Sequence, residues 1–117
     1  MGLNMDLKQL AGAIDADLVW GPDGWEEVNI ETVFASDLMS DVLMSDRDEM
    51  LLITSLSTEQ AIRSASIVGS EAVVIANSKT VTEGMIELAR DQEIALFCTR
   101  YPKYESCVRI GRMLESR

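Results

Sequence analysis

Residues 50–54 read Met-Leu-Leu-Ile-Thr, an unbroken apolar run of strand length that ends in a hydroxyl. Residues 72–76 (AVVIA) and 94–98 (IALFC) repeat this pattern further along the chain. A run without polar alternation is typical of a strand that is covered on both faces, as in a parallel sheet. The three runs therefore predict buried strands in the middle of an α/β sheet.

Amphipathic stretches separate these runs and predict helices. The predicted helix starts are Asn4 as an N-cap, Ser57 with Gln60 as a capping box, Thr82 as an N-cap, and Pro102 at the first position of a last helix that runs to about Leu114. Gly69 is expected to end the second of these helices. Strands alternating with helices predict a mostly parallel sheet flanked by helices.

The N-terminal part adds two further strands to this prediction. Residues 17–20 predict a short strand, residues 21–24 (GPDG) a tight turn, and residues 28–34 an alternating strand. We expect the two strands to form a hairpin that Trp20 and Trp25 close, although these two rings could instead stack on a ligand. One antiparallel pairing of this kind would make the sheet mixed.

Residues 35–46 (ASDLMSDVLMSD) contain Ser-Asp three times. The spacing predicts a helix in which Ser36 is the N-cap, Asp37 lies in the first turn, and Asp37 and Asp41 share the solvated face. A metal site is the alternative, but two carboxylates on one helix face supply too few oxygens for a hard cation. We therefore expect no metal and no cofactor.

Charge and composition exclude several classes of function. The chain has 117 residues, 47% of them hydrophobic, and a net charge of −10, which repels nucleic acids and anionic membranes. It has no histidine, so Ser-His and Cys-His catalysis are excluded within the chain. Two cysteines without a metal-binding spacing, and no apolar N-terminal run, predict a soluble cytoplasmic protein without a signal peptide.

Small polar residues follow the predicted strands at the points where helices or loops begin. In open α/β sheets, ligands bind outside the carboxyl ends of the strands. Such residues also belong in loops and caps, so a purely structural role stays open. The predicted ligand-binding residues, called the strand-end rim below, are Ser36, Asp37, Thr54, Ser55, Asn77, Thr99 and Arg100.

Three separate blocks carry a resemblance to a known family. They are residues 33–43 (VFASDLMSDVL), residues 51–54 (LLIT) and residues 99–114 (TRYPKYESCVRIGRML). In this order the blocks resemble the DRTGG domain, which is related in fold to the N-terminal domain of HPr kinase/phosphorylase. The resemblance implies a small α/β regulatory or ligand-sensing module, often attached to CBS domains or phosphotransacetylases, and often dimeric.

The chain departs from that family at one place. Relatives often carry Thr-Gly-Gly shortly before the Ser-Asp, whereas Glu31-Thr32-Val33 stand here. Glycines permit close approach of the backbone to a ligand, and their replacement removes that freedom. The chain also lacks the GxxxxGK[ST] loop of phosphate-binding kinases.

These observations predict a single domain over residues 1–117 that is regulatory and not an enzyme. We expect it to bind a small anionic metabolite, such as a nucleotide or phosphorylated compound, and to act through protein–protein contacts as a homodimer or with another protein. A scaffold subunit without a ligand is the alternative. A small enzyme that uses Asp37 and Asp41 as acid and base is the third possibility.

Overall fold

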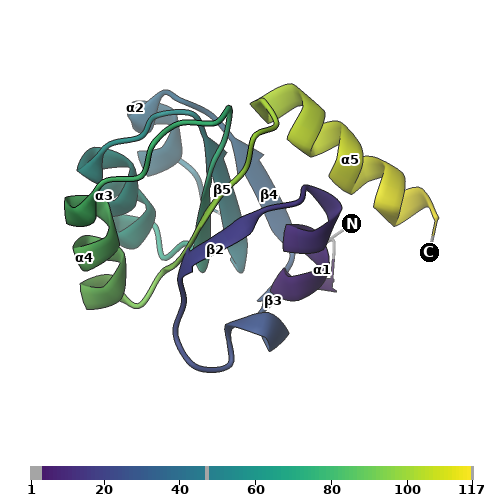
Figure 1. Cartoon of the computed structure of the whole chain (residues 1–117), viewed down its shortest axis with the longest axis horizontal. Coiled ribbons are helices and arrows are strands. Elements are labelled where there is room, and N and C mark those ends of the chain that lie inside the picture. The colour runs from purple at the N-terminus through teal and green to yellow at the C-terminus, as the bar shows by residue number, and fades with distance from the viewer. Residues whose placement is uncertain (1–3, 47, 117) are drawn as a thin grey trace.

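The computed structural model describes residues 4–46 and 48–116 and contains a five-stranded mixed sheet (Figure 1). The strand order is β2-β7-β6-β5-β4, with bounds Asp17–Trp20, Ala95–Cys98, Ala72–Ile75, Met50–Thr54 and Thr32–Ala35. Strands β4, β5, β6 and β7 run parallel, and β2 pairs antiparallel with β7. The predicted small α/β fold with a mostly parallel mixed sheet is therefore confirmed.

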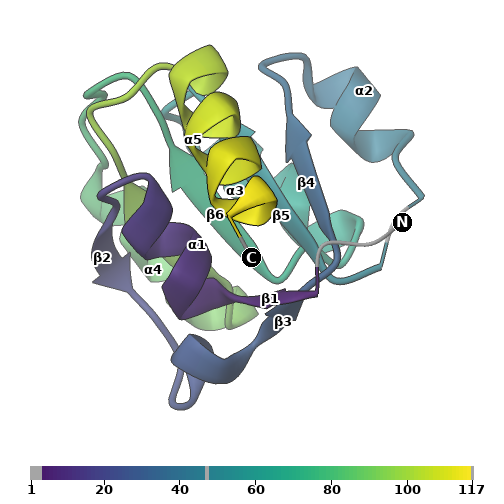
Figure 2. The same ribbon diagram turned by 90° about the vertical axis from the view of Figure 1, so that its right-hand side faces the viewer.

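Helices cover both faces of the sheet. Helices α1 (Leu7–Ala13) and α5 (Lys103–Glu115) lie on one face (Figure 2). Helices α2 (Met39–Leu43), α3 (Glu59–Ile67) and α4 (Glu83–Gln92) lie on the other. None of the helices in the described ranges has the length and apolar character needed to cross a membrane.

The two apolar cores follow from the two-residue period of a strand. Leu51 and Ile53 point into the core under α1 and α5, whereas Leu52 points into the core under α2, α3 and α4. All five residues of β5 are buried, and so are all four of β6. The unbroken apolar runs in the sequence are explained by this double cover.

The predicted N-terminal hairpin is wrong, although the predicted turn and the mixed sheet are right. Trp25 donates its N–H to the Pro22 carbonyl within the turn, and a 3₁₀ helix (η1, Trp25–Glu27) follows. Trp25 does not close a hairpin with Trp20; its ring packs edge-on against Phe97, 5.3 Å between centroids. Strand β2, which precedes the turn, pairs instead with β7, the last strand in the sequence.

The strand predicted over residues 28–34 is divided into two. Its first part, β3 (Asn29–Ile30), pairs antiparallel with β1 (Met5–Asp6) in a separate two-stranded sheet. Its second part is β4, which begins after Glu31 and joins the main sheet. Met5 and Ile30 are both buried, so the short pair seals the edge of the core under α1.

Several helix starts also differ from the prediction. Asp6, not Asn4, caps α1, in a capping box with Gln9. Helix α3 begins after Thr58, because the Ser57 hydroxyl instead donates to the Thr80 carbonyl. Thr82 caps α4 as predicted, and its hydroxyl accepts the N–H of Met85 at 3.3 Å. Pro102 is the N-cap of α5 rather than its first residue.

Candidate ligand site at the strand-end rim

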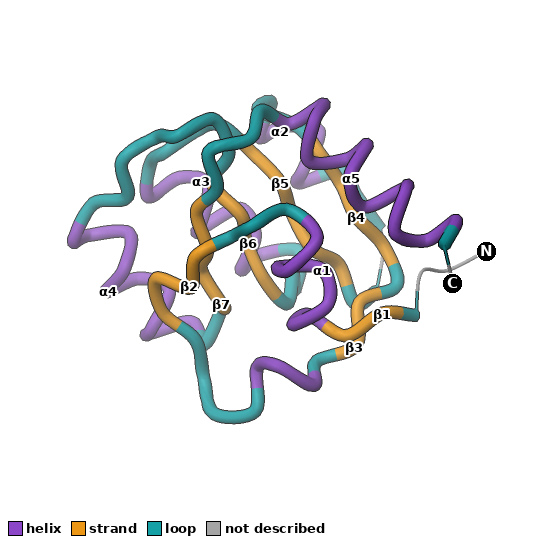
Figure 3. Tube along the Cα trace, turned by 45° about the vertical axis from the view of Figure 1, so that its right-hand side comes forward, coloured by secondary structure: helices purple, strands orange, loops and turns teal. Residues whose placement is uncertain are grey.

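The sheet brings the ends of four parallel strands to one edge, where the loops after β5, β6 and β7 gather (Figure 3). Backbone hydrogen bonds continue past the strands across this edge. Ala76 donates to the Thr54 carbonyl at 2.8 Å, and Ser78 donates to the Thr99 carbonyl at 3.0 Å. The predicted residues that follow these strands therefore do lie along one rim of the molecule.

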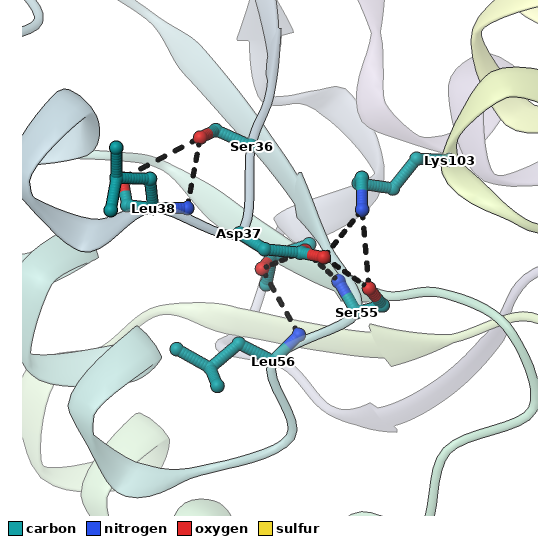
Figure 4. A network of polar contacts seen from close by, with 7 residues as sticks. Ser36, Asp37, Leu38, Ser55, Leu56 and Lys103 are labelled. Atoms are coloured by element: carbon teal, nitrogen blue, oxygen red, sulfur yellow. Dashed lines mark hydrogen bonds and ion pairs between the residues drawn. The ribbon is translucent and has the colours of Figure 1, made fainter.

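Asp37 is the centre of a polar network at the β4 end of this rim (Figure 4). One carboxylate oxygen accepts the Ser55 N–H at 2.7 Å and the Thr54 hydroxyl at 3.0 Å. The other accepts the Ser55 hydroxyl at 2.6 Å and the Lys103 ammonium at 2.5 Å. The network ties the loop after β4 to the loop after β5 and to the first residue of α5.

The predicted N-cap role of Ser36 is wrong, and so is the place of Asp37 in a first helical turn. Helix α2 begins at Met39, with Leu38 as its N-cap. The Ser36 hydroxyl accepts the N–H of Leu38 at 3.0 Å, a local turn that precedes the helix. The carboxylate of Asp37 is thereby left to bond across the rim instead of capping its own helix.

Four donors outweigh the cost of partial burial for this carboxylate. Burial alone would raise the pKa of Asp37, but the hydrogen bonds from Lys103, Ser55 and Thr54 hold the pKa well below its usual range. Asp37 is therefore a fixed negative charge at neutral pH. It can accept hydrogen bonds but has no proton to donate, which makes it unsuited to the acid role that the enzyme hypothesis considered.

Lys103 is the one cation in this network, and the sequence-based prediction did not include it. Its ammonium also donates to the Ser55 hydroxyl at 3.2 Å, and its side chain is 33% exposed. The sequence did contain a signal, because Lys103 directly follows Pro102, the predicted start of a helix that leaves the same rim. The ammonium can therefore be reached from solvent while Asp37 holds it in place.

Thr54 and Thr99 are buried, and both hydroxyls are already paired. Thr54 donates to Asp37 and accepts the Leu56 N–H at 3.1 Å. Thr99 donates to the Ile14 carbonyl at 2.7 Å, which joins the end of β7 to the end of α1. These two residues lie under the surface of the rim, and their hydroxyls are not available to a ligand.

Arg100 is not brought together with Asp37. Strand β7 is three positions from β4 in the sheet, about 14 Å at the usual spacing of neighbouring strands. The Arg100 guanidinium instead donates to the Tyr101 hydroxyl at 2.8 Å and lies 3.6 Å from the Asp15 carboxylate. Lys103 near β4 and Arg100 near β7 are thus separate cationic positions on the rim.

Asn77 lies between them with an exposed side chain and a left-handed backbone, φ 67°. Asparagine adopts this region more readily than most residues, and Ser78 adopts it as well, φ 56°. The Asn77 N–H donates to the Tyr101 carbonyl at 2.9 Å, so the turn is fixed by the loop after β7. Local backbone geometry is therefore a sufficient reason for asparagine here, and its amide remains open to solvent.

Three surface cavities in the described part of the chain contain none of the seven predicted residues. One of about 550 Å³ lies beside β4 and α2, and one of about 530 Å³ lies beside the turn at residues 21–24. A smaller one of about 240 Å³ lies between α3 and α4. A ligand at the rim would accordingly lie on the network described above and not in one of these cavities.

Comparison with known proteins identifies the fold. No family model and no curated protein matches the sequence. A solved structure does match: the CBS and DRTGG domains of the regulatory region of Clostridium perfringens pyrophosphatase, complexed with its activator diadenosine tetraphosphate. The TM-score is 0.73 at 12% identity, over 90% of this chain and 45% of that one. The chain therefore spans less than half of its structural neighbour, and its fold is that of a DRTGG-like domain.

Proposed function

We propose that this chain is a non-enzymatic regulatory domain that binds a small anionic metabolite at the strand-end rim. The observation that carries the proposal is the Lys103 ammonium, partly exposed and held on the rim by Asp37 and Ser55. A phosphate or carboxylate that approaches from solvent meets this ammonium and the exposed Asn77 amide. Asp37 and Ser55 hold the ammonium and Thr54 bonds to Asp37, while Ser36 and Thr99 form part of the rim around them.

The structural neighbour supports a nucleotide as the class of ligand. That protein is a regulatory region whose activator is diadenosine tetraphosphate, a molecule with several phosphates in a row. A polyphosphate offers one phosphate to Lys103 and another to Arg100 on the same rim. It would also supply enough charge to compete with Asp37 for the lysine.

Ligand binding at the rim would regulate a partner through protein–protein contacts. We expect a homodimer or a complex with another protein, in a reducing compartment such as the cytoplasm that suits the two free thiols Cys98 and Cys107. We also expect residues 1–117 to act as one domain. A scaffold subunit without a ligand remains the second candidate, because each group on the rim also has a structural partner or role.

A thermal-shift screen tests the proposal, with ATP, diadenosine tetraphosphate, acetyl phosphate and a sugar phosphate as probes. A ligand at about 100 times its Kd stabilises the folded state by about 2.7 kcal/mol, which is readily measured as a higher Tm. We expect at least one polyphosphate to raise the Tm of the unmodified chain. We expect Lys103→Gln to abolish this rise, whereas Lys8→Gln on the exposed face of α1 keeps it.

Each variant is compared with its own ligand-free Tm, because loss of the Lys103–Asp37 pair changes stability by itself. No rise with any probe, or an equal rise in Lys103→Gln, would favour the scaffold without a ligand. Turnover of a probe that disappears in the Asp37→Asn/Asp41→Asn double variant would instead revive the enzyme hypothesis.

A further inference from the structure

Strand β4 is the last strand at one edge of the five-stranded sheet, where it pairs with β5 alone among the described strands. Thr32 and Ser36 donate their N–H groups to the Glu49 and Ile53 carbonyls, so the even-numbered residues face β5. Successive residues of a strand point their backbone groups to opposite sides, so Val33 and Ala35 face outward. The outward N–H and C=O groups of these two residues have no hydrogen-bond partner among the described residues.

The two edges of the sheet differ in how they are protected. Natural edge strands avoid unwanted pairing through charges, prolines, bulges or a covering element. The opposite edge, β2, begins with Asp17 and has an irregular register between Leu18 and Trp20. Strand β4 reads Thr-Val-Phe-Ala, keeps a regular register with β5, and carries neither a charge nor a proline. It is therefore a ready template for one more strand.

A groove with acidic walls runs beside this open edge. The cavity of about 550 Å³ is lined by Phe34 of β4, by Asp41 and Met44 of the α2 segment, and by Ser45 and Asp46. The Met44 side chain is 82% exposed, so the groove offers an apolar surface as well as two carboxylates. A strand added to β4 would direct every second side chain toward it.

We propose that the β4 edge binds an extended, cationic segment of a partner protein by strand addition. The partner's backbone pairs with Val33 and Ala35, and its lysine or arginine side chains pair with Asp41 and Asp46. A second copy of this chain fits less well, because it brings a net charge of −10 and the same two carboxylates to the interface. The inference rests on the protein-contact part of the proposed function and does not require a ligand at the rim.

The test uses the full chain labelled with ¹⁵N and a capped six-residue peptide of alternating lysine and valine. We expect the peptide to shift the amide signals of Val33 and Ala35 and to slow their hydrogen exchange, since these amides become hydrogen-bonded. The matched control is the same peptide with glutamate in place of lysine, which we expect not to bind because Asp41 and Asp46 repel it.

Two sets of variants separate backbone pairing from charge. Ala35→Pro removes an outward N–H on an exposed residue without touching the bonds to β5, and should weaken binding about tenfold. Asp41→Asn/Asp46→Asn should weaken it by about two- to tenfold, whereas the exposed Asp91→Asn on α4 should not. If Ala35→Pro does not fold, the exchange of the Val33 and Ala35 amides in the unmodified chain decides the matter.

Equal binding of both peptides, or no effect of the lysine peptide on the two amides, would overturn the proposal. So would a dimer in sedimentation that Ala35→Pro converts to a monomer, because a second copy would then occupy the edge. Failure here is distinct from failure of ligand binding, which the thermal-shift screen reports through Lys103.

Discussion

At the scale of single residues, the rim depends on how Asp37 is used. A carboxylate one residue after a serine, ahead of an apolar run, suggests a helix start from local sequence alone. In the fold it accepts two bonds from Ser55, one from Thr54 and one from Lys103. Because Lys103 is 66 residues away, no local rule identifies this pairing. Sequence analysis singled out Asp37, but it placed this carboxylate at a helix start and not in the network that the structure shows.

The lowered pKa of Asp37 makes the stability of the domain sensitive to acid. A carboxyl whose pKa is lower in the folded state than in the unfolded state stabilises the fold above its unfolded pKa, near 3.8, and loses that effect as the pH falls through the folded pKa. We expect Asp37→Asn to lower the free energy of unfolding by about 1–2 kcal/mol at pH 7. This deficit should shrink as the pH falls below about 5.

Urea unfolding of both proteins between pH 7 and pH 3 measures this difference. Asp48→Asn, on an exposed residue outside the network, serves as the matched control. A deficit of Asp37→Asn that stays constant across the range would show that the charge of Asp37 does not stabilise the network.

At the scale of elements, the buried strands were the most predictable part of the molecule. Strands β5, β6 and β7 lie within one residue of their predicted bounds, because a fully apolar run has no other place in a small domain. The hairpin prediction was wrong because the pairing of β2 is not decided by local sequence. Turn chemistry at residues 21–24 reveals that the chain bends, but the partner of β2 is β7, which lies far along the sequence. The pairing of two strands so far apart in sequence is decided by the packing of the whole sheet.

The C-terminal end of α4 offers a test of the left-handed backbone conformation at Glu93. Glu93 ends α4 in a left-handed conformation, φ 55°, which a side chain makes costly. We expect Glu93→Gly to raise the free energy of unfolding by about 0.5–1 kcal/mol. Glu87→Gly, on the exposed face in the middle of the same helix, should lower it by about 0.5–1 kcal/mol.

Denaturant unfolding of the two variants beside the unmodified chain gives both signs in one experiment. Destabilisation by both substitutions would mean that α4 does not end at Glu93 as described.

At the scale of the whole molecule, the parallel sheet explains why separate polar residues meet. The carboxyl ends of four strands share one edge, so Ser36, Ser55, Asn77 and Thr99 gather there without any common motif. Their shared edge was predictable from the expected parallel direction of the strands. The burial of each side chain was not predictable from the sequence. Thr54 and Thr99 are buried because of their contacts with Asp37 and with the end of α1. Lys103 enters through α5, which crosses back from β7 toward β4.

The measurement that tests the central claim most directly is nuclear magnetic resonance of the lysine ammonium groups during a titration with ATP and with inorganic tripolyphosphate. The account predicts that the Lys103 signal, held in its pair with Asp37 at the start, shifts progressively to saturation, while the Lys8 signal on α1 stays where it is. A Lys103 signal that remains unchanged at millimolar concentrations of both anions, or that moves no more than the Lys8 signal, would contradict it.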